Sequence, residues 1–319
     1  MSRVERLQSV FVAVAALGGL GLGLILPGAH YAEGAVLPLL LVMLTAVFLQ
    51  MEASGVGAVR RARGLVLLSL VLNFVVTPAL AFALGAGLLG EEPDLRIGLL
   101  LLLVTPCTDW YLVFTAAARG HTGIAAALLP LNLVLQLVLL PVYVLLLGGE
   151  AATVDVGTLL GAVGLVLLVP LGVAALVRWT AAHRPSGVFG GGLRRLQEVA
   201  GAVVVPLLCL AVAAMFASQA DTVLAQWDAV VLLLPALLIF FTLLPLLSAG
   251  AGHVAGLPAS HRVTLIMTTT ARNSPIALGI AVAAFPDRPL IAVALVLGPL
   301  LELPLLALIA QLVRVPEAR

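Results

Sequence analysis

Charged residues are scarce in this chain of 319 residues, and their scarcity excludes most soluble folds. Only 10% of the residues are charged and 62% are hydrophobic, and the mean hydropathy is +1.22. Soluble domains contain about 25% charged residues and about 45 to 50% apolar residues. A soluble domain of this length would leave much of its apolar surface in water. We therefore expect lipid to be the solvent for most of the chain.

Lysine is absent, and all sixteen basic residues are arginines. These arginines are scattered among the connecting segments, and the formal net charge is only +1. Nucleic-acid binding usually needs a concentrated basic surface. The sequence therefore predicts no nucleic-acid partner.

Cysteine and the usual catalytic motifs are also missing or nearly so. The two cysteines, Cys107 and Cys209, lie in apolar runs, so we expect no disulfide framework. The chain contains neither a His-Glu-x-x-His nor a Gly-x-Ser-x-Gly motif, and its five histidines map to predicted loops. The sequence therefore predicts neither an intramembrane enzyme nor a cofactor. A pure scaffold or receptor is not favoured either, because buried charges would be costly without a use.

Long apolar runs dominate what is present. A helix that crosses a bilayer needs about 20 mostly apolar residues, and ten such runs lie between charged or Gly- and Pro-rich breaks. The sequence predicts an all-α polytopic membrane protein with one membrane domain over residues 1–319 and ten transmembrane helices. The ten runs lie approximately at residues 10–26, 36–51, 65–89, 97–118, 124–147, 157–177, 199–217, 230–249, 263–285 and 290–313.

The arginines also predict the orientation of these spans. With a cytoplasmic N-terminus, thirteen of the sixteen arginines fall in cytoplasmic segments, and only Arg96 and Arg288 fall in outer loops. Cytoplasmic loops are enriched in arginine and lysine. We therefore expect a multi-pass protein of the cell (plasma or inner) membrane with both termini in the cytoplasm.

Five spans in each half give the two halves opposite orientations, which is the arrangement of an inverted repeat. The halves divide at about residues 1–180 and 181–319. The longest connecting segment, near residues 181–193, contains a run of three glycines and is expected to be a loop.

Three ionisable side chains fall deep in apolar runs: Asp109 in span four, Arg272 in span nine and Glu302 in span ten. Charges at membrane depth are expensive unless they are paired, neutralised or exposed to water, so function is the first hypothesis. The alternative is a structural ion pair between Asp109 and Arg272. Glu302 lies between Pro299 and Pro304 and suits proton coupling, with structural neutralisation as its alternative.

Spans four and nine are also interrupted by polar residues and proline. Pro106 and Pro275 lie in the segments Thr-Pro-Cys-Thr-Asp and Ala-Arg-Asn-Ser-Pro. Proline cannot donate a helical hydrogen bond, and it pushes the preceding residue out of the helical region. Interrupted helices at equivalent positions of two halves indicate a binding site near the membrane midplane. Two proline kinks packed against Thr and Ser are the alternative.

Other polar and small residues fit structural roles. Cys107 is a candidate soft ligand or a small packing residue. Asn73, Asn132 and Gln136 are expected to hydrogen-bond across helices more often than to bind a solute. The glycine-rich stretch of span one, with glycines 18, 19, 21 and 23, predicts close helix packing.

The motifs of spans four, nine and ten resemble those of the bile acid/sodium symporter superfamily, and within it those of the arsenite efflux permeases. The motifs are Thr105-Pro106-Cys107-Thr108, then Ala271-Arg272-Asn273-Ser274-Pro275 with Ala277-Leu278, and Gly298-Pro299-Leu300-Leu301-Glu302-Leu303-Pro304. The resemblance implies ten helices in a panel domain and a core domain. It also implies that spans four and nine unwind and cross at the site.

The resemblance assigns candidate roles to single residues. It implies that Cys107 is the thiol that contacts trivalent arsenic, as a single and therefore labile sulfur ligand. Sodium-coupled relatives use hydroxyl, amide and carboxylate oxygens, which Thr108, Asp109, Asn273 and Ser274 could supply. The arsenite permeases usually carry a glutamate in span nine, and this chain has none there. Either Asp109, Arg272 or Glu302 takes over the charge, or the substrate is no longer arsenite.

Two transport functions follow from these residues. The first is efflux of arsenite or antimonite, coupled to protons or to the membrane potential. The alternative is a sodium- or proton-coupled symporter of an organic anion, with Arg272 attracting the carboxylate or sulfonate. Both functions imply the same kinds of partner: a small-molecule or oxyanion substrate, H⁺ or Na⁺ as the coupling ion, and the lipid bilayer.

Overall fold

The computed structural model describes residues 3–50, 62–90, 92–107, 110–148, 155–183, 188–225 and 227–315, and these residues are overwhelmingly helical, without a strand. The α-helices of the first part are α1 (Arg3–Ile25), α2 (Glu33–Leu49), α4 (Arg63–Val71), α5 (Thr77–Leu88), α6 (Pro93–Val104), α7 (Trp110–Ala117), α8 (Thr122–Leu147), α9 (Val156–Val163) and α10 (Val169–His183). Those of the second part are α11 (Val188–Ser218), α12 (Ala220–Ala225), α13 (Trp227–Val231), α14 (Leu233–Val254), α15 (Ala259–Thr270), α16 (Ser274–Ala284) and α17 (Pro289–Leu312). A 3₁₀ turn, η1 (Ala29–Ala32), precedes α2, and π-helical stretches η2 (Leu72–Val76) and η4 (Gly164–Leu168) join α4 to α5 and α9 to α10.

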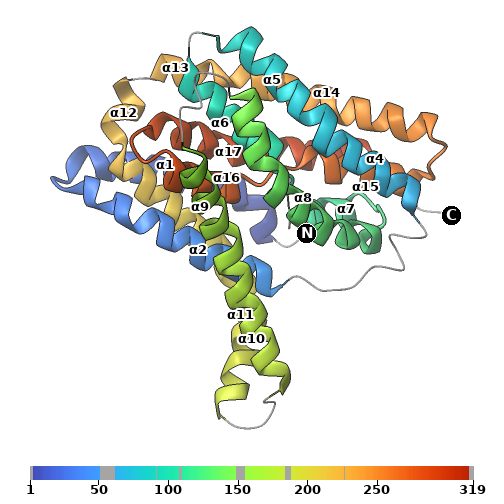
Figure 1. The fold of residues 1–319 in the computed structure, drawn as a ribbon, viewed down its shortest axis with the longest axis horizontal. Coiled ribbons are helices and arrows are strands. Elements are labelled where there is room, and N and C mark those ends of the chain that lie inside the picture. Colours follow the sequence, from blue (N-terminus) through green and yellow to red (C-terminus); the bar gives the residue numbers. More distant parts are fainter. Residues whose placement is uncertain are drawn as a thin grey trace.

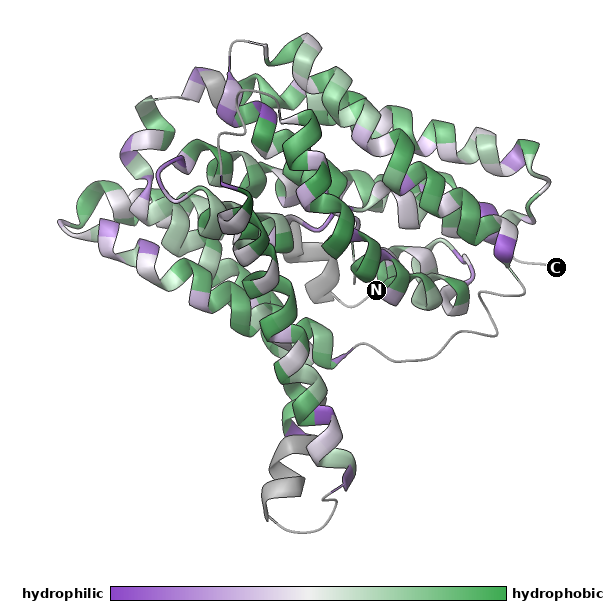
Figure 2. Cartoon of the chain, in the orientation of Figure 1, coloured by the Kyte–Doolittle hydropathy of each residue, from purple (hydrophilic) through white to green (hydrophobic). Residues whose placement is uncertain are grey.

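Seven helical stretches of the described chain are long and apolar enough to cross a membrane. They are Ala29–Leu49, Arg63–Leu88, Thr122–Leu147, Val156–His183, Val199–Ser218, Leu233–Val254 and Pro289–Leu312. Most of the helical ribbon in Figure 2 is coloured as hydrophobic, whereas hydrophilic residues gather mainly at helix ends and loops. Many large apolar side chains, such as Leu17, Leu67 and Leu246, are exposed. Apolar side chains that point outward are what a lipid environment requires. The chain is a multi-pass α-helical membrane protein.

The remaining predicted spans consist of shorter pieces. The apolar part of α1 is Val10–Ile25. Predicted span four is divided into α6 and α7, and predicted span nine into α15 and α16. Both divisions fall at the predicted polar segments, and they are described with the site below.

Helices α1, α2, α10 and α11 form one group, in which α11 packs against α1 and α2, and α2 also against α10 (Figure 1). Glycines bring α1 close to α11: a Cβ at Gly19 would lie 2.3 Å from the carbonyl oxygen of Ala213, and one at Gly23 would lie 2.4 Å from that of Ala217. The predicted close packing is confirmed at these two glycines. It is wrong at glycines 18 and 21, where a Cβ would meet nothing within 4 Å.

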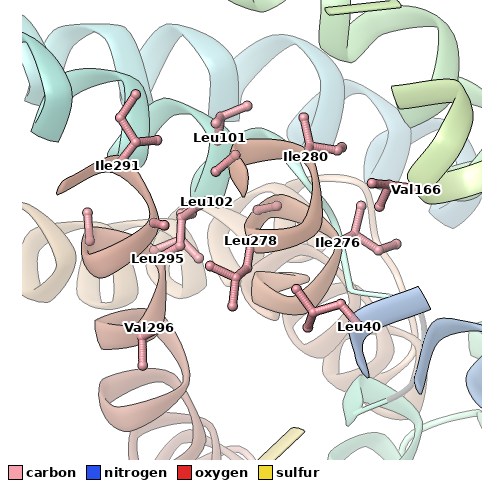
Figure 3. Close-up of a cluster of buried hydrophobic side chains, with 14 of the residues drawn as sticks. Leu40, Leu101, Leu102, Val166, Ile276, Leu278, Ile280, Ile291, Leu295 and Val296 are labelled. Atoms are coloured by element: carbon pink, nitrogen blue, oxygen red, sulfur yellow. The ribbon is translucent and has the colours of Figure 1, made fainter. Parts of the chain in front are cut away.

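A continuous apolar core joins this group to the site-bearing helices α6, α16 and α17. Figure 3 shows part of this core, to which all three helices and also α2 and η4 contribute side chains. The labelled residues are Leu40, Leu101, Leu102, Val166, Ile276, Leu278, Ile280, Ile291, Leu295 and Val296. Close-packed interiors transmit small displacements. This core therefore couples the interrupted helices to the helices packed around them.

The segment near residues 181–193 is helical at residues 181–183 and 188–193, where a loop is predicted. Helix α10 continues to His183 and α11 begins at Val188, so only residues 184–187, which lie outside the described residues, separate them. The α10–α11 hairpin projects from the body of the protein in Figure 1. Polar and glycine residues were interpreted as a loop, but a helix can continue beyond the hydrocarbon layer. The 31 residues of α11 span about 46 Å, against about 30 Å for that layer.

Candidate functional site

The first interruption separates α6 from α7. Helix α6 ends at Val104, and Thr105 has extended backbone angles (φ −99°, ψ 95°) because it precedes Pro106. The Thr105 hydroxyl donates to the carbonyl of Leu101 (2.8 Å), which satisfies a group at the helix end. The predicted break at Pro106 is confirmed. The candidate residues Thr108 and Asp109 lie outside the described residues.

The second interruption separates α15 from α16. Helix α15 ends at Thr270, and Ala271 is extended (φ −70°, ψ 137°). Asn273 caps α16, because its side-chain oxygen accepts a hydrogen bond from the N–H of Ile276 (3.1 Å). Pro275 lies in the first turn of α16, where its missing N–H leaves no bond unmade. Pro275 therefore begins a new helix and does not merely kink an existing one.

The two extended segments cross in an antiparallel arrangement and hydrogen-bond to each other. The N–H of Cys107 donates to the carbonyl of Ala271 (3.1 Å), and the N–H of Asn273 donates to the carbonyl of Thr105 (2.8 Å). Pro106 and Arg272 face each other between these two bonds. Residues more than 160 positions apart in the chain thus form one short ladder at the crossing. This pairing rules out two independent proline kinks.

Arg272 lies at the crossing and is only 2% exposed. Its guanidinium donates to the carbonyl of Leu103 (2.8 Å), to the side-chain oxygen of Asn73 (2.8 Å), and to the carbonyls of Thr269 and Thr270 (3.3 Å for Thr270). Three of these four acceptors are carbonyls at the C-terminal ends of α6 and α15. Helix C-termini carry partial negative charge that a cation offsets. Arg272 therefore caps two helix ends that converge inside the protein.

Two further groups support Arg272. Glu302 of α17, 3% exposed, accepts a hydrogen bond from the backbone N–H of Arg272 (2.7 Å). The ring of Phe240 lies 5.4 Å from the guanidinium carbon, within the range of a cation–π interaction. The two predicted buried ionisable residues of spans nine and ten are therefore in contact, through the backbone of Arg272. Because Asp109 lies outside the described residues, its pairing with Arg272 stays a prediction.

Asn73 ties the π-helical stretch η2 to the second interruption. Its amide nitrogen donates to the carbonyl of Thr268 (3.3 Å), while its oxygen accepts from Arg272. Its predicted role of hydrogen bonding across helices is confirmed. Sequence reasoning did not connect Asn73 to Arg272, because residues 199 positions apart carry no local signal of contact.

Ser274, the other candidate at the crossing, is the first residue of α16, and its hydroxyl lies beside α17. It is 3% exposed, and its hydroxyl has no hydrogen-bond partner among the described residues. Gly298 of α17 makes room for it, because a Cβ at that position would lie 2.6 Å from the Ser274 oxygen. A larger residue at position 298 would fill this space.

Cys107 is fully buried in an apolar cluster that also contains Tyr111 and Ile266. The cluster borders an open cavity of about 370 Å³ between α14, α15 and the C-terminal end of α17. Ile266 and Val263 belong to both the cluster and the cavity wall, which also includes Arg262. A cavity thus reaches the edge of the cluster that holds the thiol. The described residues contain no group of three His, Cys, Asp or Glu side chains able to hold a metal ion.

A hydrogen bond and a ring contact join the start of α8 to α15 at the end that holds this cavity. The N–H of His121 donates to the hydroxyl of Thr264 (2.7 Å), and the rings of His121 and His261 lie 5.6 Å apart. Burial, and to a lesser extent the nearby His121, lowers the pKa of His261. His261 lies in the first turn of α15 and His253 in the last turn of α14, so the interpretation of these histidines as loop residues is wrong.

Asn132 and Gln136 on α8 form none of the expected bonds across helices to residues that the structure describes. Both side chains are fully buried, and none of their amide atoms has a hydrogen-bond partner within the described part of the chain. Composition and spacing cannot reveal whether a buried amide has a partner, because the partner lies on another helix and leaves no signal in the local sequence.

An all-helical membrane chain with two interrupted helices that cross belongs to the class of membrane transporters with discontinuous helices. The comparisons with known proteins agree with this class. The family model described as Sodium Bile acid symporter family matches residues 37–226, and the chain belongs to this family. The Arsenical-resistance protein Acr3 of Corynebacterium glutamicum is 26% identical over 292 residues, which cover 88% of this chain and 78% of that protein. Both parts of the predicted resemblance are confirmed.

Proposed function

We propose that this protein exports arsenite or antimonite, and that Cys107 is the residue that recognises the trivalent element. The observation that carries the proposal is the position of Cys107 within the extended segment of the crossing. The similarity to an Arsenical-resistance protein over most of the chain supports the same substrate.

A single thiol suits selection followed by release. Arsenous acid exchanges one hydroxyl for the sulfur of Cys107: an As–S bond forms, an As–O bond breaks, and the thiol proton leaves with the hydroxyl as water. Soft thiolate sulfur favours such soft acceptors over hard cations. Three sulfur ligands would hold arsenic too tightly for transport, whereas one contact is reversed by water. Cys209 lies on α11, away from the crossing, and we assign it no role.

The bonding of Arg272 supports an uncharged solute over an organic anion. A guanidinium has five N–H donors, and four hydrogen bonds from Arg272 to protein acceptors are present. A substrate carboxylate would have to displace carbonyl groups of α6 or α15 from these donors. Arg272 therefore serves chiefly to hold the crossing together.

We further propose ten membrane crossings in an inverted repeat of five and five, within one domain. Helices α6 and α7 together then form the fourth membrane span, and helices α15 and α16 together form the ninth. Each first half-helix ends in an extended segment, and the two segments pair antiparallel, as an inverted repeat requires. We place both termini in the cytoplasm and the protein in the plasma or inner membrane. In support, Arg262 and Arg314 line the cavity at one end, whereas Asp94 pairs with Arg288 near the start of α6 and α17.

The proposed substrate site comprises Cys107, Thr108, Asp109, Arg272, Asn273 and Ser274. We propose Asp109 and Glu302 as carriers of the coupling ion, a proton or sodium, because either ion neutralises a carboxylate at membrane depth. Glu302 is well placed for this role, since its carboxylate contacts the backbone at the crossing. Rocking of the group α1, α2, α10 and α11 against the other helices would open the crossing to each side in turn.

A sodium-coupled symporter of an organic anion is the second candidate, and the family match favours it. In this case Arg272 would bind the anion directly, and transport would be indifferent to loss of the Cys107 thiol. The two candidates therefore differ in whether transport depends on the Cys107 thiol.

The test is arsenite tolerance and cellular arsenic content in a bacterial host without its own arsenic efflux pumps. The host expresses the wild-type protein, Cys107→Ser, Asp109→Asn or, as the matched control, Cys209→Ser. We expect tolerance and low cellular arsenic for the wild type and the control, and loss of both for Cys107→Ser at equal expression.

Two results would overturn the proposal. A well-expressed wild-type protein that confers no tolerance would exclude arsenite efflux, and sodium-dependent uptake of organic anions would become the leading function. Full tolerance with Cys107→Ser would exclude thiol recognition. If Asp109→Asn loses tolerance while Cys107→Ser keeps it, thiol recognition is excluded and the coupling role is assigned to Asp109.

A further inference from the structure

Two amide side chains on α8 are buried without partners, and neither the thiol nor Arg272 explains them. Asn132 and Gln136 are fully buried, and all four of their amide nitrogen and oxygen atoms lack a hydrogen bond to any described residue. A buried polar group left unsatisfied costs about 1 to 3 kcal/mol. Two adjacent amides in this state, at membrane depth, point to a bound molecule that completes their hydrogen bonds.

The two amides lie on the face of α8 that is directed at the Cys107 cluster. Residues 125, 129, 132 and 136 are spaced by four, three and four positions and therefore share one helix face. Ala125 and Leu129 on this face belong to the apolar cluster that contains Cys107. The face continues along α8 from the cluster to the amides.

The depth of the amides follows from the register of α7 and α8. These helices are antiparallel and joined by a short turn, and the Tyr111 hydroxyl donates to the carbonyl of Ala125 (2.7 Å). Asn132 lies seven residues further along α8, about 10 Å from that level. Leu129, one turn before Asn132, packs in the same cluster as Cys107, so Asn132 lies about one helical turn from the cluster that holds the thiol.

The chemistry of the two amides selects an uncharged, hydroxylated solute. Each amide offers one oxygen acceptor and two N–H donors, so the pair can both accept from and donate to hydroxyl groups. A bare cation would leave the N–H donors unused, and an anion would leave the oxygens unused. Arsenous acid is uncharged at neutral pH, and each of its three hydroxyls both donates and accepts.

We infer that Asn132 and Gln136 form a hydrogen-bonding subsite for the hydroxyls of a neutral solute that Cys107 holds through its central atom. This inference rests on the proposed function and adds the charge state of the solute: the transported species is the neutral acid and not its anion. The amides orient the solute, and the thiol selects it.

Replacing the amides by apolar side chains of similar size tests the inference. The double variant Asn132→Leu/Gln136→Met is compared with the wild type and with Thr115→Val, which removes another buried hydroxyl without a described partner, near the far end of α7. Everted membrane vesicles measure arsenite uptake over a range of arsenite concentrations. Thermal unfolding of the purified proteins without arsenite measures stability.

We expect the double variant to unfold at the wild-type temperature or above, because it no longer buries unsatisfied amides. Its apparent KM for arsenite should rise on the order of tenfold, as expected for two lost hydrogen bonds. The maximal rate should change much less, and Thr115→Val should behave like the wild type.

Three outcomes would overturn the inference, and each has a different cause. An unchanged KM in the double variant would show that the amides bind only water. A lower unfolding temperature with a proportional loss of rate would show a structural role. If folded wild-type protein transports no arsenite, the proposed function fails and this assignment of the solute fails with it, whereas the first two outcomes leave arsenite efflux intact.

Discussion

Two polar centres lie inside this helical bundle, and they differ in how far the protein satisfies them. The guanidinium of Arg272 meets three backbone carbonyls, the side chain of Asn73 and the ring of Phe240. The amides of Asn132 and Gln136 meet no hydrogen-bonding group among the described residues. Both centres are buried among apolar side chains, so the difference is not one of location. The guanidinium with its full set of internal partners stabilises the fold, whereas the two amides, which lack described partners, are available to a solute.

The two centres also differ in the free-energy cost of losing their partners during transport. A charged side chain in a low-dielectric interior needs partners in every state of the transport cycle, because an unpaired charge there is prohibitive. A neutral amide costs far less when it is unpartnered. It can therefore alternate between a bound solute and water as the cycle proceeds. This contrast makes substitutions at the two centres differ in sign as well as in size.

The largest effect is expected from Arg272→Leu. This change leaves the ends of α6 and α15 facing each other without a cation and leaves Glu302 without its neighbouring charge. Removing one member of a buried charged network typically costs about 3 to 5 kcal/mol. We expect little monodisperse protein in size-exclusion chromatography and a sharply lower unfolding temperature. Near-wild-type stability would mean that the crossing does not depend on this cation.

The same substitution at two asparagines gives the sharpest comparison. Asn73→Leu deprives both Arg272 and the carbonyl of Thr268 of a partner, so we expect a loss of about 1 to 3 kcal/mol in stability. Asn132→Leu deprives no described group of a partner, and it should be neutral or stabilising. Thermal unfolding in one detergent measures both variants. Equal destabilisation by the two would remove the distinction between satisfied and unsatisfied centres.

Much of the crossing could be predicted from the sequence, because its determinants are local. Pro106 and Pro275 limit the conformation of their own neighbourhoods, and the break at each follows from that limit. The meeting of Arg272 with the carbonyl of Leu103 could not be predicted, because it depends on where two helix ends arrive after packing. The α10–α11 hairpin was predicted to be a loop for another reason. Polar residues indicate where the chain leaves the bilayer, but a helix need not end there.

Glu302→Gln is expected to have an intermediate effect that appears mainly in transport. Glutamine keeps an oxygen that accepts the N–H of Arg272, so stability should fall by no more than about 1.5 kcal/mol. Glutamine cannot bind the coupling proton. Arsenite uptake into everted vesicles should therefore lose its response to an imposed pH gradient, while uptake driven by the arsenite gradient persists. A variant with the full pH-gradient response would exclude Glu302 as the proton carrier.

The smallest effect on stability is expected at the ion pair between Asp94 and Arg288, where the two charges are paired with each other and also partly exposed. The side chains of Asp94 and Arg288 are each 24% exposed, and the Arg288 Nε donates to the Asp94 carboxylate (2.8 Å). Exposed ion pairs contribute about 0 to 1 kcal/mol, and salt screens them. Asp94→Asn should therefore lower the unfolding temperature only slightly, and the difference from wild type should shrink further in high salt. A loss of stability as large as that of Arg272→Leu would mean that the number of partners, and not burial, decides how much a charged group contributes to stability. The contrast between Arg272 and the two amides would then need a different physical explanation.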